Sequence, residues 1–211
     1  MGTALSQLDH LVYVTPDLPG TVDALSRTLG VVAAPGGRHP GWGTRNALLG
    51  LGPTAYLEIM GPDPESSPSD RKRPLGIDGL TGARLATWVV RSQRLHDVAA
   101  TARAHGIDLG EVQSRSRQRP DGSLLAWTMT DLTADREGGI IPCFIDWGDS
   151  VHPAQAAPSG CRLIGLRAVH PEPERIGSIL KSLGLDLAVQ RGKVFELAAE
   201  IDTPNGLVWV S

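Results

Sequence analysis

Two polar side chains interrupt apolar runs of the chain, and the first is His10. It lies in LDHLVYV (8–14), where strand alternation puts four side chains on one face: Leu8, His10, Val12 and Val14. A lone imidazole in such a series is either a metal ligand or a hydrogen-bonded core histidine. We predict that His10 is a ligand, with the core role as the alternative.

The second polar residue is Glu58, in AYLEIMG (55–61). Its neighbours on the same face are Tyr56 and Met60, and a carboxylate between apolar residues is costly to bury without a partner. Either Glu58 meets a cation or a metal ion, or this face opens to water. Together with His10, it favours a site that binds a ligand.

The stretch GRHPGWGTRN (37–46) places contact-capable side chains on an irregular backbone. Binding residues often lie on such loops, although a solvated hairpin connection is the alternative. His39 titrates near neutral pH and Arg45 carries a fork suited to a carboxylate or phosphate, so we predict catalytic roles for both. Trp42 and Asn46 are predicted to stack on and orient a planar ligand.

Three further residues are candidates for ligand binding. Trp88 and Trp127 lie on predicted strands, either in the core or on a cavity wall, and His152 lies in a loop that is either folded over the site or an exposed linker. The chain has five tryptophans against two tyrosines and two phenylalanines, which favours a pocket for a flat or apolar small molecule.

A repeated unit positions these residues. Three segments have helical apolar spacing and end in glycine followed by an apolar residue: 19–32, 92–109 and 172–187. Gly30, Gly106 and Gly184 recur at nearly constant spacing, where left-handed helix caps are expected. A strand-like run precedes each helix: 8–14, 84–90 and 162–169.

Further strands are predicted after each helix. They are 45–52 and 55–61; 111–116, 123–132 and 140–148; and 187–192, 195–201 and 207–211. Turn signals occur at 120–122 and 205–206, and Pro-rich bridges at 61–76 and 148–160. The pattern predicts an α+β fold of repeated βαβββ modules, with helices outside an open, cup-like mixed sheet.

We predict a domain over 1–150 made of two modules (7–61 and 83–148), and an additional half module over 151–211. The composition is that of a globular protein, with 41% hydrophobic and 20% charged residues and a net charge of -3, so we expect no nucleic acid as a partner. We also expect no membrane partner, since no apolar run reaches the roughly 18 residues of a spanning helix. The N-terminus does not resemble a signal peptide, and two isolated cysteines suit a reducing cytosol, so a cytoplasmic protein is expected.

The repeated unit, opening with LDHLVYVTPDL and closing with AYLEIMG, resembles the vicinal oxygen chelate superfamily, and in particular its glyoxalase-like domains. HPGWGTRNALLGLG and the later PCFIDWG are similar to the branch described only as a glyoxalase-like domain. The resemblance covers roughly residues 7 to 150. It implies a cup in which first and last strands of two modules supply ligands to a divalent metal.

His10 and Glu58 occupy the ligand positions that the resemblance implies in the first module. The second module departs from the pattern, because Ala86 and Ile145 stand at its corresponding positions. A triad of two histidines and one carboxylate would need another histidine, for which His39 is a candidate. The implied cofactor is one divalent ion, Zn, Fe, Ni or Mn, or none.

Two functions follow from the resemblance. One is a metal-dependent lyase, isomerase or dioxygenase acting on a small oxygen-rich or planar molecule. The other is a metal-free small-molecule binding or resistance protein without catalysis. A scaffold in which the third module buries the cup is a third reading. The cup forms within one chain or by exchange between two, so a homodimer is also a candidate.

Overall fold

The computed structural model of the protein describes residues 4–66, 72–118 and 124–211. The three predicted helices are confirmed as α1 (Leu18–Leu29), α2 (Leu95–Ala104) and α3 (Pro173–Ser182). Gly30, Gly106 and Gly184 follow them with φ of 70°, 80° and 78°, a left-handed conformation that glycine adopts without steric cost. The predicted turn at 120–122 lies outside the described residues, as does part of the bridge at 61–76.

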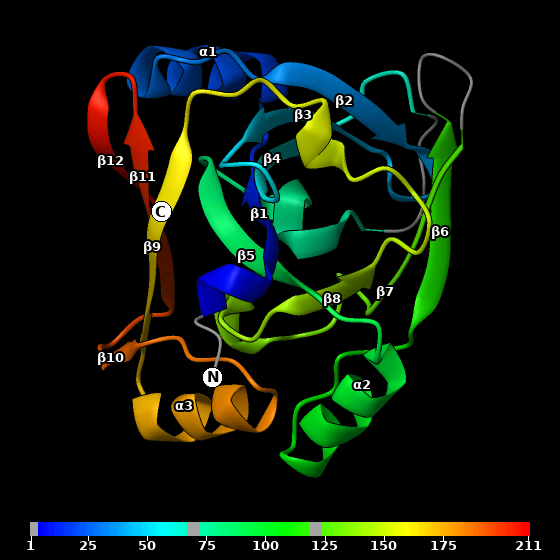
Figure 1. The fold of residues 1–211 in the computed structure, drawn as a ribbon, viewed down its shortest axis with the longest axis vertical. Helices are drawn as coiled ribbons and strands as arrows, with labels where there is room; N and C mark the ends of the chain where they lie inside the picture. Colours follow the sequence, from blue (N-terminus) through cyan, green and yellow to red (C-terminus); the bar gives the residue numbers. More distant parts are fainter. Residues whose placement is uncertain (1–3, 67–71, 119–123) are drawn as a thin grey trace.

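An eight-stranded sheet forms the cup. Its strands, in spatial order, are β2 (Ala34–His39), β3 (Thr44–Gly50), β4 (Tyr56–Pro62), β1 (Leu8–Val14), β5 (Arg84–Arg91), β8 (Cys143–Asp146), β7 (Leu124–Met129) and β6 (Gln113–Gln118). The two halves repeat one topology, because β1 pairs parallel with β4 and β5 pairs parallel with β8. β1 and β5 join them antiparallel, and the sheet curves until β2 approaches β6 (Figure 1). The predicted α+β fold with a cup-like mixed sheet is confirmed.

The stretch 37–46 is more regular than the sequence indicates. Its first residues end strand β2, a 3-10 turn covers Pro40–Trp42, and β3 begins at Thr44. The sequence pattern does not indicate strand β2, because Pro35, Gly36 and Gly37 have low strand propensity. β2 is an edge strand, however, and edge strands tolerate proline and glycine. The prediction of a loop over the whole stretch is therefore wrong for its ends.

Two β-bulges at the centre of the cup change which side chains face inward. On β1, Leu8 pairs with Val90 and His10 with Val89, so Asp9 is an extra residue. Because two residues then oppose one, Asp9 and His10 both turn to the cup while Leu8 packs outside in the main core. The expectation that Leu8 shares a face with His10 is therefore wrong.

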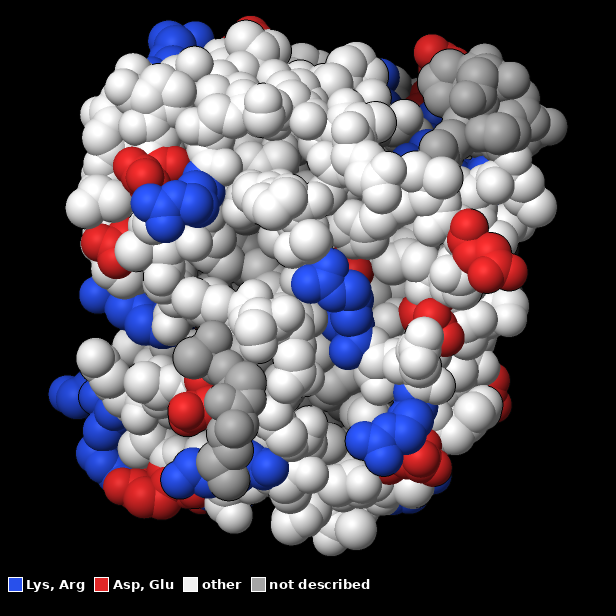
Figure 2. All heavy atoms as spheres, viewed as in Figure 1, with Lys and Arg blue, Asp and Glu red and all other residues white. Residues whose placement is uncertain are grey.

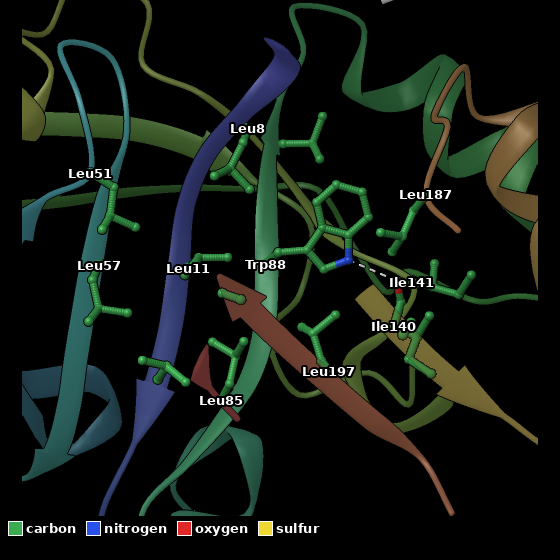
Figure 3. Packing of buried hydrophobic residues seen from close by; sticks show 14 of the residues in the cluster. Leu8, Leu11, Leu51, Leu57, Leu85, Trp88, Ile140, Ile141, Leu187 and Leu197 are labelled. Carbon is green, nitrogen blue, oxygen red and sulfur yellow. Dashed lines mark hydrogen bonds between the residues drawn. The ribbon is translucent and has the colours of Figure 1, made fainter. Parts of the chain in front are cut away.

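A second sheet covers the outer face of the cup. Its order is β10 (Val189–Arg191), β9 (Arg162–His170), β11 (Glu196–Thr203) and β12 (Gly206–Val210). Chain order matches the other units, but β9 here lies between β10 and β11, unlike β1 in the first module. Leu187 and Leu197 pack with Trp88 in one core that both sheets share (Figure 3). The division near residue 150 stays a prediction.

The surface carries charges of both signs. On the face shown in Figure 2, acidic and basic side chains are interspersed rather than gathered into one basic area. In the described part of the chain, no helix is long and apolar enough to cross a membrane.

Candidate functional site

A cavity of about 40 Å³ lies inside the cup, between its two halves. Six residues singled out in the sequence line it: His10, His39, Trp42, Asn46, Glu58 and Trp127. Its other lining residues are Leu48, Tyr56, Arg117, Leu125, Met129, Leu132, Ile145, Trp147 and Pro153. The space suits a few water molecules or one small group of a ligand.

Glu58 lies at the centre of the polar side of this cavity and is 8% exposed. Asn46 Nδ2 donates to Glu58 Oε1 at 2.5 Å, and Gly37 N donates to Asn46 Oδ1 at 2.6 Å, which fixes the orientation of the amide. A Cβ on Gly36 would lie 2.2 Å from Asn46 Oδ1, so glycine leaves room for this arrangement. Glu58 Oε2 lies 3.6 Å from His10 Nε2.

His10 is held from behind by Asp9. The His10 Nδ1 and Asp9 Oδ1 atoms are 2.7 Å apart, and the imidazole stacks on Tyr56 with ring centroids 4.6 Å apart. Burial acts to raise the pKa of Asp9, but hydrogen bonds and charges from His10 and His152 outweigh it and lower that pKa below its usual range. Because Asp9 is ionised and accepts only, Nδ1 carries the proton and Nε2 is turned to the cavity.

The segment between β8 and β9 closes the mouth of the cup, and runs across the front of the eight-stranded sheet in Figure 1. Two of its side chains reach Asp9 Oδ2, His152 Nε2 and Trp147 Nε1, each at 3.0 Å. Gly50 N also donates to Pro158 O at 2.8 Å. His152 is therefore anchored over the cup instead of being an exposed linker residue.

His39 and Tyr56 complete the ionisable groups on the polar side. His39 Nε2 lies 4.0 Å from Glu58 Oε1, and its Nδ1 lies 3.1 Å from Thr44 Oγ1. Burial lowers the pKa of His39, which favours the neutral imidazole at neutral pH. Burial and the charges of Asp9 and Glu58 raise the pKa of Tyr56 well above its usual value, so its phenol stays protonated.

The opposite wall comes from the second half of the cup and is largely apolar. Met129, Leu132 and Ile145 face the cavity there, with Trp127 and Trp147 in contact at 5.6 Å between ring centroids. Trp127 Nε1 donates to Met129 Sδ at 3.1 Å. The two halves therefore divide the site into a polar side and an apolar, aromatic side.

Three predicted site residues do not line this cavity. His152 lies over the mouth of the cup, whereas Trp88 and Arg45 point away from it. Trp88 is fully buried in the core outside the cup, where its indole N–H donates to Ile140 O at 2.8 Å (Figure 3). A bulge on β5 reverses the alternation, so that Val89 faces inward instead. Arg45 follows Thr44 and precedes Asn46 on β3, so alternation turns it to the other face of the sheet.

Arg115 and Arg117 of β6 place basic side chains on the inner face of the cup, where the sequence analysis expected Arg45. Arg115 pairs with Trp127 and Arg117 with Leu125 across strands β6 and β7, so both share the inward face. The alternation in QSRSRQ (113–118) is the signal that would have found them. Asp9 was missed because a bulge has no comparable signal in one sequence.

These side chains form only part of a site for the divalent metal that the sequence resemblance implies. The 3.6 Å between His10 Nε2 and Glu58 Oε2 matches two ligands each about 2 Å from one ion. The second half offers no matching donor, since Val89 pairs with His10 and Ile145 lines the apolar wall. Among the described residues, no group of three or more His, Cys, Asp or Glu could hold an ion, so the donor set does not fit a complete site.

Comparisons with solved structures agree with this fold. A hypothetical protein from Staphylococcus aureus has a TM-score of 0.63 at 13% identity, covering 90% of this chain and 87% of that one. Methylmalonyl-CoA epimerase from Streptomyces coelicolor, in complex with 2-nitronate-propionyl-CoA, has a TM-score of 0.45 at 19% identity, covering 70% and 98%. The Mycobacterium tuberculosis epimerase gives 0.40 at 18% identity, covering 69% and 89%. At 13% identity the first likeness concerns the fold alone, and the two epimerase matches, with TM-scores below 0.5, support no conclusion.

A family model is more specific. No curated protein matches this chain significantly. The model described as a glyoxalase-like domain, however, matches residues 8–184, which include both halves of the cup, the closing segment and α3. The chain therefore belongs to the glyoxalase-like domain family of the vicinal oxygen chelate superfamily.

Proposed function

We propose that the cup is the active site of an isomerase that moves a proton on a small molecule with a C–H bond next to a carbonyl group. The observation that carries this proposal is the linked set Asp9, His10 and Glu58, which presents an imidazole and a carboxylate to one small cavity. Groups of this kind act as general acids and bases when they lie within reach of the reacting atoms.

In this mechanism the Glu58 carboxylate takes the proton from carbon. The electron pair of the C–H bond moves onto the carbonyl oxygen, where the Nε2–H of His39 donates to the developing enolate. The proton then returns from Glu58 to the same carbon or to its neighbour, so that no other reactant is consumed. Asn46 holds Glu58 in place, and the apolar wall limits competition from water. No step passes through a metal ion, because the donor set for one is incomplete.

A second candidate function is binding without catalysis. It is favoured by the aromatic wall of Trp127 and Trp147 and by the closing segment, which together would enclose a flat ligand. In this case Glu58 and His10 would only orient a bound molecule. The two functions differ in whether a proton leaves carbon.

Deuterium exchange separates these functions. The intact protein is incubated in D₂O with pyruvate, phenylpyruvate or hydroxyacetone, and the C–H signal next to the carbonyl is followed by NMR. We expect exchange above the rate without protein for at least one probe. Glu58→Gln is expected to slow it by about 100-fold or more, since a positioned base contributes about 10²–10⁴.

The matched control is Glu196→Gln, which removes a carboxylate from β11 of the second sheet, far from the cup. It is expected to leave exchange unchanged. Binding of a probe without any exchange would favour the second candidate. Exchange that is equal in wild type and Glu58→Gln would overturn the proposed role of Glu58.

A further inference from the structure

We propose that the closing segment and the edge of the cup form a separate apolar chamber, which binds a compact apolar group of the ligand, about the size of one ring. This chamber rests on the proposed function, because the same molecule places its acidic C–H bond in the inner cavity. It states which class of carbonyl compound suits the site. The proposal concerns binding, and so it is tested without any turnover.

The chamber lies beneath the closing segment and has a volume of about 160 Å³. Its apolar lining comes from β2, β3, β7 and the closing segment: Pro35, Leu48, Leu125, Pro153, Ala156 and Ala157. Leu48, Leu125 and Pro153 also line the inner cavity of about 40 Å³. Since the inner cavity takes only a small group, the rest of a ligand must extend beyond it, and the chamber adjoins it.

The polar side chains that line the chamber are already bound within the protein. His152 Nε2 lies 3.0 Å from Asp9 Oδ2, and its Nδ1 accepts from Ala154 N at 3.2 Å, so both ring nitrogens have partners. Arg117 is likewise engaged with other groups of the protein. A polar group of a ligand would have to displace one of these contacts, whereas an apolar group would not.

The backbone around the chamber favours the same kind of ligand group. Proline has no N–H group, so Pro35 and Pro153 bring no amide donor to the lining. In the closing segment, Gln155 N donates to His152 O and Ala156 N donates to Pro153 O, at 3.1 Å each. These amides are used within their own turn. Binding in the chamber therefore depends on removing apolar ligand surface from water.

The volume of the chamber limits the size of the group. An apolar cavity of about 150 Å³ holds a molecule such as benzene, and the chamber has nearly the same volume. A phenyl ring or a branched alkyl group of similar size therefore fits, whereas a fused two-ring system is too large. The expected ligand carries one such group on a carbonyl compound with an acidic C–H bond.

The test compares neutral ketones that differ only in the ring they carry. 2-Butanone, 4-phenyl-2-butanone and 4-(2-naphthyl)-2-butanone are titrated into the intact protein at neutral pH, with binding followed by calorimetry. Because burial of an aromatic ring favours binding, we expect the phenyl ketone to bind about tenfold or more tightly than 2-butanone. The naphthyl ketone is expected to bind more weakly than the phenyl ketone, since its second ring does not fit.

Two variants fill the chamber from the closing segment. Ala156 lines the chamber and is otherwise exposed, so the larger side chain of Ala156→Phe is compatible with the fold. We expect this variant to lose the preference for the phenyl ketone while its affinity for 2-butanone stays unchanged. Ala157→Leu, at the next position, is expected to act in the same direction. Ala100→Phe, on the exposed side of α2, is the matched control and is expected to retain the preference.

Equal affinity for the phenyl ketone and 2-butanone in wild type would overturn the proposal, as would no binding of the phenyl ketone up to about 5 mM. A preference that persists in both Ala156→Phe and Ala157→Leu would also overturn it, because the ring would then bind elsewhere. So would a naphthyl ketone that binds as tightly as the phenyl ketone. Deuterium exchange is measured separately. A protein that prefers the phenyl ketone but exchanges no deuterium would retain the chamber and lose the proposed catalysis.

Discussion

Asp9 is the residue whose replacement tests the architecture of the site most directly. It is fully buried and ties a β1 side chain to the segment over the mouth of the cup. We expect Asp9→Asn to lower stability and to loosen His10 and His152 together. An asparagine of nearly equal size keeps one acceptor oxygen but turns an N–H₂ group toward neighbours that themselves donate.

The size of the effect follows from the three contacts that Asp9 accepts. They come from His10 Nδ1 at 2.7 Å, and from His152 Nε2 and Trp147 Nε1 at 3.0 Å each. A hydrogen bond to a charged group contributes about 1.5–3 kcal/mol, and asparagine retains part of the set, so we expect a loss of about 3 kcal/mol. For a chain of 211 residues this corresponds to a fall in Tm of about 6–12 °C.

The pH dependence adds a second, independent signature. Since hydrogen bonds and charges from the histidines outweigh burial and lower the folded-state pKa of Asp9 below its ordinary 3.8, its stabilising contribution is complete above about pH 4. That contribution is lost as the pH falls through the folded-state pKa. The difference in free energy of unfolding between wild type and Asp9→Asn is therefore expected to narrow below about pH 4.

Urea unfolding at neutral and acidic pH, followed by circular dichroism, measures both quantities. Asp23→Asn, on the exposed side of α1, serves as the control and is expected to change the free energy of unfolding by less than about 0.5 kcal/mol. A neutral-pH loss below about 1 kcal/mol for Asp9→Asn would refute the reasoning, because the three contacts would then contribute little in solution.

Three further predictions follow from other parts of the structure. Gly37→Ala is expected to lower the free energy of unfolding in urea by about 1 kcal/mol, because its Cβ would lie 2.2 Å from Arg117 Nη1; an unchanged free energy of unfolding would argue against this contact. Trp88→Phe is expected to cost about 2–3 kcal/mol in urea unfolding, through lost packing and the lost bond to Ile140 O, while probe binding in the cup stays the same. Treatment with EDTA is expected to leave deuterium exchange unchanged, and a loss that Mn²⁺ or Zn²⁺ restores would reinstate the metal-dependent form of the reaction.

Periodicity and glycine position were enough to predict the repeated modules and their helices. The left-handed glycines end the predicted helices because no other residue adopts that conformation as readily. The predicted third unit has the expected chain order, but its sheet order differs from that of the first two. The order of elements along the chain does not specify which neighbour each strand pairs with. The sequence pattern therefore could not predict this difference in sheet order.

Alternation placed Glu58 correctly on a strand without a bulge, and it placed His10 correctly because the bulge of β1 lies before it. Glu58 and Asn46 face the cavity from β4 and β3, whose pairing is regular over its whole length. The prediction that Trp88 contacts a ligand is not supported, because a bulge on β5 reverses the alternation of inward and outward side chains just before it. A one-residue change in register moves a side chain to the other face, so one unseen bulge is enough to exchange a core residue for a site residue.

His39, Trp42 and Asn46 lie in or beside an irregular stretch for a reason that only the closed sheet makes visible. β2 must approach β6 there, and the two glycines of β2 leave space for Asn46 and Arg117. The same stretch also brings His39 within 4.0 Å of Glu58. The glycine-rich composition of this stretch therefore reflects the close approach of β2 to β6 more than a need for backbone flexibility.

The asymmetry between the two halves constrains any chemistry that this cup performs. Their topology is the same, yet the position paired with His10 is Val89, and Ile145 faces Glu58 from an apolar wall. In the proposed reaction, proton transfer therefore depends on the first half, while the second half contributes the aromatic surface of Trp127 and Trp147. Under this proposal, a ligand that suits both halves combines an acidic C–H bond with a flat or apolar group. If the proposal holds, replacing Glu58 abolishes deuterium exchange while the ligand still binds, and replacing Trp127 weakens binding while the proton-transfer groups stay in place.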